Sequence, residues 1–325
     1  MTTASLFVRM LRWRVTVTLW FFLLIGAAAQ GPLRFHVTLV LAAVALAASY
    51  VVATTVNDIA DRDVDRINHP RDRGRPLVDG TATERDLWRT NAVAAPLALV
   101  TAAAAGGPIL GVTGASLAIG YAYSLRPIRL SYRTWLAPVV LGVAYAVVPY
   151  ALGVIAAGGR IGGSDVVRCL GLYALLVARI NLKDFRDRSG DAAYGKPTLL
   201  LCHGKQVTCA VTGVATVAGC AILAVGLGGH PEVVAVIGAL GMGVLSMLRD
   251  LWHASDPRGE QVAIGLGAKL GNGLLACALA ALVLRAEAAP AGITALALAS
   301  VALVFGSIVT ALRSRPDRIE IAYKG

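Results

Sequence analysis

Residues 37–65 read VTLVLAAVALAASYVVATTVNDIADRDVD, and this stretch decides the class of fold. Its first part, residues 37–56, contains no charged side chain. It matches the run of about 20 apolar residues that a helix needs to cross the hydrocarbon core of a bilayer. Four aspartates follow within the last nine residues. The stretch therefore predicts a transmembrane helix that ends in an acidic cluster.

The rest of the chain extends this pattern. Hydrophobic residues make up 57% of the 325 residues and charged residues only 15%, which is too few to cover a soluble protein of this size. We expect an all-α fold, a polytopic bundle of transmembrane helices that forms one domain over residues 1–325. Ten apolar runs predict its spans, at residues 16–30, 37–56, 91–105, 109–124, 136–156, 166–180, 207–227, 232–248, 263–284 and 291–312.

The basic residues indicate how these spans are oriented. The net charge is +11, but the lysines and arginines lie between apolar runs and do not form the single patch of a nucleic-acid-binding protein. If the spans alternate from the N-terminus, nearly all basic residues fall on one side, which the positive-inside rule places in the cytoplasm. We therefore expect an integral protein of the plasma membrane. Its expected cytoplasmic parts are the N-terminus, the loops 57–90, 125–135, 181–206 and 249–262, and the tail 313–325.

The N-terminal run has a second interpretation. Three arginines at 9, 12 and 14 precede an apolar run that ends in Ala27, Ala28 and Ala29, which is also the pattern of a secretory signal peptide. We favour an uncleaved first span, because the run continues into a polytopic pattern.

Two clusters of aspartates carry the chemistry. The first cluster follows the pattern N-D-x-x-D-x-x-x-D at Asn57, Asp58, Asp61 and Asp65. On a helix, 100° per residue puts its three aspartates within about 60° of one another, in a single acidic stripe. The spacing D-x-x-D-x-x-x-D recurs after the sixth span, at Asp184, Asp187 and Asp191. The repeat favours a shared function over the alternative that these are solvated charges at helix ends.

Six carboxylates that face one cavity repel one another and resist ionisation unless cations accompany them. Hard oxygen ligands with room for water favour Mg²⁺ over zinc or copper. Carboxylates cannot hold a diphosphate directly, because like charges repel, whereas Mg²⁺ can join carboxylate and phosphate oxygens. The five cysteines form no C-x-x-C pair and the histidines show no ligand spacing, so we expect no zinc site.

At these residues the chain resembles the UbiA superfamily of membrane prenyltransferases, in which two aspartate motifs follow the second and sixth transmembrane helices. The likeness continues through 68-NHPRDRGRPLVDG, through Tyr123 and Ser124 with Arg126, and through 195-GKPTL. It covers the chain from about the second span to residue 206. The resemblance implies nine transmembrane helices around a central cavity open to the cytoplasm and to lipid. A tenth span would be a departure, so the expected number is nine or ten.

The resemblance also implies roles for single residues. The ligands that bind Mg²⁺ and ionise the diphosphate would be Asp58, Asp61, Asp65, Asp184, Asp187 and Asp191, with Asn57 beside them. The expected substrate-binding residues are Asn57, Arg75, Tyr123, Arg126, Lys183 and Lys196. The four basic residues among them also satisfy the positive-inside rule without a further role, and the tyrosine could equally anchor the chain at the interface. Arg129 and Arg133 are expected to contact lipid headgroups.

The resemblance implies a Mg²⁺-dependent prenyltransferase, because transfer is the commoner activity in the superfamily. Its allylic prenyl diphosphate would ionise to a cation, and an aromatic or other small nucleophilic acceptor would take the prenyl group. The alternative is a terpene cyclase of the same superfamily, in which the chain's own double bond attacks the cation. A divalent-cation transporter is a weaker alternative, because transporter ion sites usually lie near the bilayer midplane. The acceptor, the length of the prenyl chain and the oligomeric state stay open.

The N-terminal sequence bears on the acceptor. Superfamily members that act on hydroxybenzoate commonly carry an Arg-Pro pair near the first helix. The corresponding region here reads 11-LRWRVTVTLW and has no proline. This difference counts against an acid acceptor of the quinone pathway type.

Overall fold

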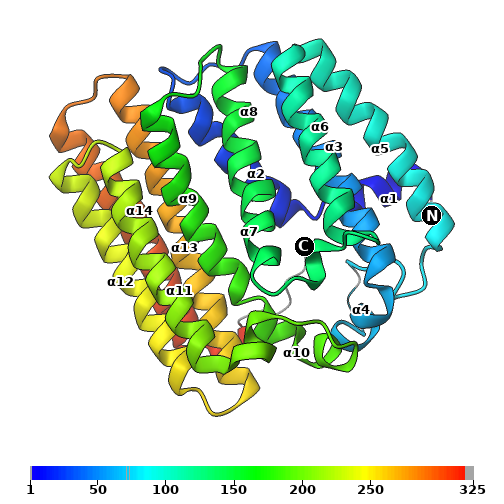
Figure 1. Cartoon of the computed structure of the whole chain (residues 1–325). Coiled ribbons are helices and arrows are strands. Elements are labelled where there is room, and N and C mark those ends of the chain that lie inside the picture. Colours follow the sequence, from blue (N-terminus) through cyan, green and yellow to red (C-terminus); the bar gives the residue numbers. More distant parts are fainter. Residues whose placement is uncertain (1, 71, 73, 319–325) are drawn as a thin grey trace.

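A computed structural model describes residues 2–70, 72 and 74–318, and every regular element in this part of the chain is helical. The expectation of an all-α fold is therefore confirmed. The long helices lie side by side as a bundle, with two short helices, α4 and α10, at one end (Figure 1). Residues 319–325 of the expected cytoplasmic tail lie outside the described residues.

The ten expected spans all coincide with helical segments. The helices are α1 (Thr3–Met10), α2 (Trp13–Ala28), α3 (Val37–Ala60), α4 (Arg62–Asn68), α5 (Glu84–Ala105), α6 (Gly107–Ser124), α7 (Leu136–Gly142), α8 (Val148–Ala156), α9 (Gly163–Asn181), α10 (Asp184–Ala193), α11 (Leu199–Gly226), α12 (Pro231–His253), α13 (Pro257–Ala286) and α14 (Ala291–Arg313). A π-helical turn, Val143–Val147, joins α7 to α8 into one continuous rod.

Among the described residues, six rods are long and apolar enough to cross a membrane. They are α3, the rod of α7 and α8, α11, α12, α13 and α14. The pair α1 and α2 makes a seventh if it counts as one span bent by 61°. The chain is thus an integral membrane protein. Because α5, α6 and α9 are long enough but less apolar than these rods, nine or ten crossings stays a prediction.

Helix packing divides the bundle into two groups. In one group α3 packs on α5 and α6, and in the other α9 packs on α11, α12 on α13, and α13 on α14. α8 packs on α2, and α2 also contacts α13, so α2 and α8 connect the two groups of helices. Close approach of α2 and α8 depends on small residues, since a Cβ atom at Gly26 or Gly153 would overlap a backbone carbonyl of the other helix.

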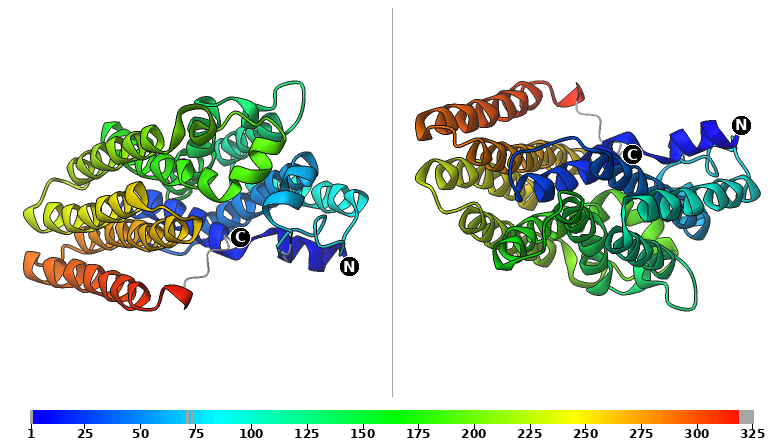
Figure 2. Two further views of the ribbon diagram at one scale, coloured as in Figure 1. Left: turned by 90° about the horizontal axis from the view of Figure 1, so that it is seen from below. Right: turned by 90° about the horizontal axis from the view of Figure 1, so that it is seen from above.

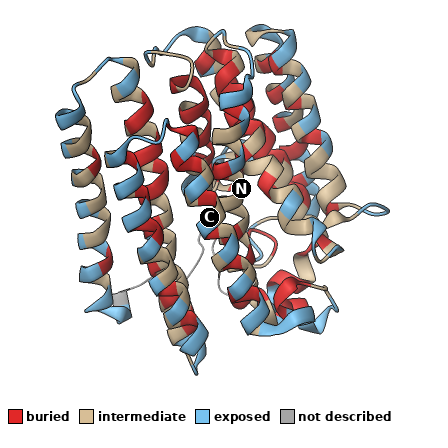
Figure 3. Cartoon of the chain, turned by 60° about the vertical axis from the view of Figure 1, so that its left-hand side comes forward, coloured by how far each residue is buried: buried red, intermediate tan, exposed pale blue. Residues whose placement is uncertain are grey.

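The outward faces of the helices are apolar. Figure 3 shows buried residues gathered on the inward helix faces and exposed residues on the outward ones. On α14, which lies at the edge of the bundle beside α13 (Figure 2), Leu296 and Leu303 are each 70% exposed. Exposed leucines of this kind face lipid tails in a bilayer without cost, because lipid tails are as apolar as leucine.

A buried carboxylate fixes the end of the bundle opposite α4 and α10. Asp165, near the start of α9, accepts hydrogen bonds from the Tyr150 hydroxyl (2.9 Å), from Gln30 (3.0 Å) and from Arg168 (3.1 Å). These partners come from α8, from the end of the α2 segment and from α9 itself. The Asp165 cluster therefore holds α9 in place at the end away from the aspartate motifs.

Candidate active site

The first aspartate motif spans a break between two helices. α3 ends at Ala60 and α4 begins at Arg62, with Asp61 between them at φ −107° and ψ 14°. The expectation of one continuous helical stripe is therefore wrong for this motif, because the chain turns at its middle aspartate. Asp58 and Asp65 nevertheless lie together, since Arg75 contacts both. Its Nη1 lies 3.3 Å from Asp58 Oδ1 and also donates to Asp65 Oδ2.

Two further arginines reach the first motif from unusual backbone positions. Arg12, at the bend between α1 and α2, donates to both carboxylate oxygens of Asp58 at 2.6 and 2.8 Å. Arg129 donates to Asp61 Oδ1 at 3.3 Å and to the carbonyl of Ala60 at 3.2 Å. Their φ values are 45° and 40°, a left-handed region that costs a non-glycine residue free energy and that concentrates at functional sites.

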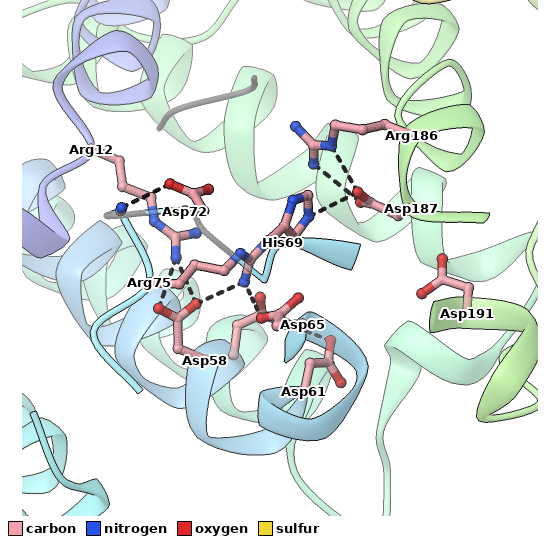
Figure 4. Close-up of polar contacts among 12 residues, drawn as sticks. Arg12, Asp58, Asp61, Asp65, His69, Asp72, Arg75, Arg186, Asp187 and Asp191 are labelled. Carbon is pink, nitrogen blue, oxygen red and sulfur yellow. Dashed lines mark hydrogen bonds and ion pairs between the residues drawn. The ribbon is translucent and has the colours of Figure 1, made fainter. Parts of the chain in front are cut away.

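The second motif lies on one short helix. Asp184, Asp187 and Asp191 all belong to α10, which follows α9 after a turn at Leu182 and Lys183. Asp187 is surrounded by basic groups (Figure 4). Its oxygens accept hydrogen bonds from Arg186 at 2.7 and 3.2 Å, lie 3.0 Å from His69 Nε2 and lie 3.6 Å from Lys183 Nζ.

The two motifs meet in one site although the sequence separates them by more than a hundred residues. Lys196 Nζ lies 3.7 Å from Asp61 Oδ2 and 3.5 Å from Asp191 Oδ1, so a single ammonium group contacts both motifs. The backbone N–H of Gly190 donates to Asn68 Oδ1 at 2.6 Å, which joins α10 to α4. Figure 4 shows Asp58, Asp61 and Asp65 of the first motif on one side of the site, and Asp187 and Asp191 of the second motif on the other.

The residues expected to bind substrate lie in different surroundings. Asn57 donates to Asp61 Oδ2 at 3.1 Å, and Arg75, Lys183 and Lys196 contact motif carboxylates as described above. Tyr123, near the end of α6, lies close to the charges of Lys196 and Asp61. Their roles toward a substrate stay predictions.

Arg126 is the exception among these residues. It is exposed, and no hydrogen bond or ion pair joins it to the described residues. Arg129, for which the sequence favoured a lipid contact, is the arginine of this loop that contacts Asp61. Neither charge pattern nor helical periodicity distinguishes the two arginines, because both lie in the same short loop. Sequence reasoning also gave no role to Arg12 or His69, whose contacts depend on segments distant in the chain.

Burial changes the acidity of these carboxylates. Burial raises the pKa of Asp65 to about 7 and that of Asp184 to about 7, despite the nearby charges of Arg75 and Lys183 respectively. Burial also raises the pKa of Asp191. For Asp187 burial acts in the same direction, but Arg186, His69 and Lys183 together hold its pKa well below the ordinary value. Burial therefore disfavours the ionised form of Asp65, Asp184 and Asp191, whereas the basic groups around Asp187 keep that carboxylate ionised.

The donor set fits a hard divalent cation. Asp191 Oδ1 is buried without a hydrogen-bond partner, and within the described residues Asp184 forms no hydrogen bond or ion pair. Carboxylate oxygens are the ligands that Mg²⁺ prefers. In the part of the chain that the structure describes, no three histidine, cysteine or acidic side chains converge tightly enough to hold a metal as they stand. A cation would therefore have to replace basic partners on these carboxylates.

An apolar pocket begins beside the second motif. It lies between α2, α9, α11, α12 and α13, and the empty space there, part of it open to the outside, is about 810 Å³. Leu182, two residues before Asp184, is part of its wall, and Phe22, Leu172 and Met247 line it further into the bundle. Arg179 is the charged residue of the lining, and it donates to Asn272 Oδ1 at 2.7 Å. The pocket therefore has an apolar interior, and its wall reaches the turn that leads into α10, although no motif aspartate lines it.

Comparisons with known proteins agree with this arrangement. A model of the UbiA prenyltransferase family matches residues 17–273. The bacteriochlorophyll synthase 33 kDa chain of Rhodobacter capsulatus is 30% identical over 209 residues, a match that covers 61% of this chain and 67% of the relative. The digeranylgeranylglyceryl phosphate synthase of Natronomonas pharaonis is 30% identical over 187 residues, covering 56% and 63%. The chlorophyll synthase of Oryza sativa subsp. japonica is 29% identical, covering 56% and 51%. The chain thus spans about half to two thirds of these curated relatives.

Solved structures share the fold. A UbiA homologue from Archaeoglobus fulgidus, bound to DMAPP and Mg²⁺, superposes with a TM-score of 0.66 at 18% identity, and the match covers 85% of this chain and 98% of that one. The apo UbiA homologue from Aeropyrum pernix K1 gives a TM-score of 0.59 at 17% identity, covering 90% and 97%. At these identities the likeness shows the arrangement of helices. α14 begins beyond residue 273, where the family match ends.

Proposed function

The chain belongs to the UbiA prenyltransferase family, and from that premise we propose that it ionises an allylic prenyl diphosphate with Mg²⁺ and transfers the prenyl group to a nucleophilic acceptor. One observation carries the proposal. Lys196 contacts Asp61 and Asp191 at once, so both aspartate motifs belong to one site, beside an apolar pocket. A diphosphate with an isoprenoid chain needs both kinds of surroundings next to each other.

The metal ligands in this proposal are the six motif carboxylates, Asp58, Asp61, Asp65, Asp184, Asp187 and Asp191. Asp191 Oδ1, which is buried and accepts no hydrogen bond, and the burial that raises the pKa values of Asp65 and Asp184 support it, because a nearby cation favours the ionised form of each carboxylate. When held by these carboxylates, Mg²⁺ would supply positive charge for the diphosphate and for the pyrophosphate leaving group.

The basic residues of the site bind the diphosphate. Arg75, Lys183 and Lys196 are paired with carboxylates in this structure. When a cation takes over those carboxylates, the guanidinium and ammonium groups become available to phosphate oxygens, for which their charge-assisted hydrogen bonds are well suited. We place Asn57 and Arg126 in the same role, as the sequence predicts.

The apolar pocket holds the prenyl chain. Its aliphatic walls exclude water, which would otherwise capture the cation. As the carbon–oxygen bond breaks, its electron pair leaves with the pyrophosphate. The acceptor then supplies the electron pair of the new bond and releases its proton to solvent. We assign Tyr123 a contact between its ring and the positive carbon, because aromatic ring faces stabilise cations.

Transfer to a separate acceptor is favoured over cyclisation by the relatives. The name of the Natronomonas pharaonis relative describes geranylgeranyl groups joined to a glyceryl phosphate, which is the product of transfer. An aromatic or other small nucleophile fits the same chemistry here. A terpene cyclase stays the second candidate, because it shares the ionisation step. We place the protein in the plasma membrane as one domain, with the site and N-terminus facing the cytoplasm, because the basic loops lie at this end.

The test uses purified full-length protein and each of geranyl, farnesyl and geranylgeranyl diphosphate. With Mg²⁺ and a nucleophilic acceptor, we expect pyrophosphate release that chelation abolishes. Asp58→Ala and Asp184→Ala should lose nearly all turnover, whereas Asp250→Asn, an exposed carboxylate paired with Arg313, should keep it. Near wild-type turnover in either motif variant would refute the two-motif mechanism. A cyclic terpene formed without acceptor, detected by gas chromatography and mass spectrometry, would assign the cyclase.

A further inference from the structure

Glu260 is a buried carboxylate that neither aspartate motif contains. It lies in the first turn of α13 and is 7% exposed. Lys205 Nζ of α11 donates to Glu260 Oε1 at 2.9 Å, and Arg188 Nη2 of α10 donates to Oε2 at 3.2 Å. Each carboxylate oxygen thus has a basic partner from a different helix.

The contact with Arg188 connects Glu260 to the second motif. Arg188 lies on α10 between Asp187 and Asp191. Asp187 lies against His69, which follows α4, whereas Arg188 reaches α13. The guanidinium of Arg188 also lies 5.5 Å from the centre of the Phe185 ring, on the same short helix. α10 is therefore held from two sides, by the loop of the first motif and by Glu260.

Lys205 is the more buried partner of Glu260, since its side chain is 23% exposed and that of Arg188 is 42% exposed. Lys205 also donates to the carbonyl of Ala254, just after α12, at 2.6 Å, so the cluster joins the ends of four helices. Ala263 and Ile264, one turn beyond Glu260 on α13, line the apolar pocket. Next to apolar surface the pairing of charges is stronger than in water, and an unpaired charge is costly. α10 is only ten residues long, and two of its other polar contacts, Asp187 with His69 and Gly190 with Asn68, lie on the side of the first motif.

We propose that Glu260 is a positioning residue that holds α10, through Arg188, so that Asp187 and Asp191 face the first motif. It touches neither metal nor substrate. The inference rests on the proposed metal-dependent function and adds to it a residue outside both motifs. If it is correct, loss of the Glu260 charge weakens metal binding through a rotation or loosening of α10, while the chemistry at saturating metal persists.

The experiment compares Glu260→Gln with the wild-type chain in lipid nanodiscs. Mn²⁺ binding in the presence of pyrophosphate, followed by electron paramagnetic resonance, gives a readout that does not depend on turnover. Because residues behind metal ligands typically change metal affinity 10- to 100-fold, we expect the Mn²⁺ dissociation constant to rise about tenfold. Backbone amides of residues 184–193 should exchange hydrogen faster. Asp250→Asn is the matched control, since its ion pair with Arg313 is exposed and lies outside this cluster.

A double-mutant cycle tests whether Glu260 acts through Arg188. Arg188→Gln alone should weaken Mn²⁺ binding. The double variant should bind Mn²⁺ no more weakly than the worse single variant, because both substitutions remove the same Glu260–Arg188 contact. Additive effects would overturn the inference. Glu260→Asp, which keeps the charge, covers the case in which Glu260→Gln does not fold, and it should recover part of the affinity.

The outcomes also separate this inference from the proposed function. If the wild-type chain bound no Mn²⁺, the proposed function and this inference would both fail. If the wild-type chain bound Mn²⁺ and Glu260→Gln bound it equally well with unchanged hydrogen exchange, the positioning role alone would fail.

Discussion

At the scale of single residues, the site is a set of ion pairs in which one cation often serves two carboxylates. Arg75 contacts Asp58 and Asp65, and Lys196 contacts Asp61 and Asp191. Buried pairs of this kind are costly to break on one side, because the remaining charge is left without a partner. The basic residues therefore keep the acidic cluster together before any metal or diphosphate is present.

This pairing predicts how the site responds to the loss of Arg75. Arg75 is 8% exposed, and Arg75→Gln would leave two buried carboxylates without their shared partner. We expect the free energy of unfolding to fall by about 3 kcal/mol or more without divalent cation. Added Mg²⁺ should restore much of the loss, since it supplies the missing charge. Thermal unfolding with and without Mg²⁺ measures both effects.

Arg66→Gln is the control for this experiment. Arg66 pairs with Asp63 at 3.2 Å, but both side chains are about half exposed, and exposed pairs contribute only about 0–1 kcal/mol. The Arg66→Gln variant should therefore unfold at nearly the same temperature as the wild-type chain. If Mg²⁺ stabilised Arg75→Gln no more than Arg66→Gln, the carboxylates beside Arg75 would not be metal ligands.

Two arginines of one loop give a second prediction at this scale. Arg129 contacts Asp61 and is half-buried, whereas Arg126 is exposed. We expect Arg129→Gln to weaken binding of the prenyl diphosphate about tenfold, since a lost hydrogen bond to a charged group costs about 1.5 kcal/mol or more. Arg126→Gln should have a smaller effect. Titration of each variant with a non-hydrolysable donor analogue measures the difference, and a larger loss for Arg126→Gln would reverse the assignment.

At the scale of helices, close packing of α4 and α10 sets the distance between the two motifs. Gly190 of α10 faces α4, where a Cβ atom would lie 2.5 Å from the carbonyl oxygen of Val64 and 2.7 Å from the side-chain amide of Asn68. The same N–H of Gly190 donates to Asn68. Glycine is therefore required here for the approach of the two backbones.

Gly190→Ala should consequently separate the motifs. We expect a lower unfolding temperature and a higher Mg²⁺ concentration for half-maximal pyrophosphate release, because Lys196 could no longer contact both motifs. Gly238→Ala on α12 is the matched substitution, since a Cβ atom there meets nothing within 4 Å. It should leave activity unchanged and stabilise the helix slightly. Equal Mg²⁺ requirements in the two variants would contradict the role of α4–α10 packing.

The sequence predicted the helices of the site better than their ends. The spacing of Asp184, Asp187 and Asp191 predicted one helix face, and all three lie on α10. The same spacing failed at Asp61, where the chain turns. Turns of this kind depend on contacts made after folding, here with Arg129 and Lys196. The left-handed backbone of Arg12 and Arg129 could not be predicted either, because the spacing of apolar residues carries no information on single φ angles.

At the scale of the whole molecule, composition was a reliable guide. Apolar runs predicted the position of every long helix, because length and apolarity are set by the bilayer and not by neighbouring helices. Which helices pack together was not predictable from these runs, since apolar faces all round a helix do not indicate a partner. The buried Asp165 cluster at the opposite end likewise depends on residues from three segments.

The direction in which the molecule crosses the membrane gives the last prediction. Ser189 on α10 and Arg160 between α8 and α9 are both exposed, and they lie at opposite ends of the bundle. The basic loops surround Ser189, so the positive-inside rule places it in the cytoplasm and Arg160 outside. We expect Arg160→Cys, in a chain with its native cysteines replaced, to react with a membrane-impermeant maleimide in intact cells. Ser189→Cys should react only after the membrane is permeabilised. Labelling of Ser189→Cys from outside would reverse the orientation, and the diphosphate would then have to reach the motifs from the external side.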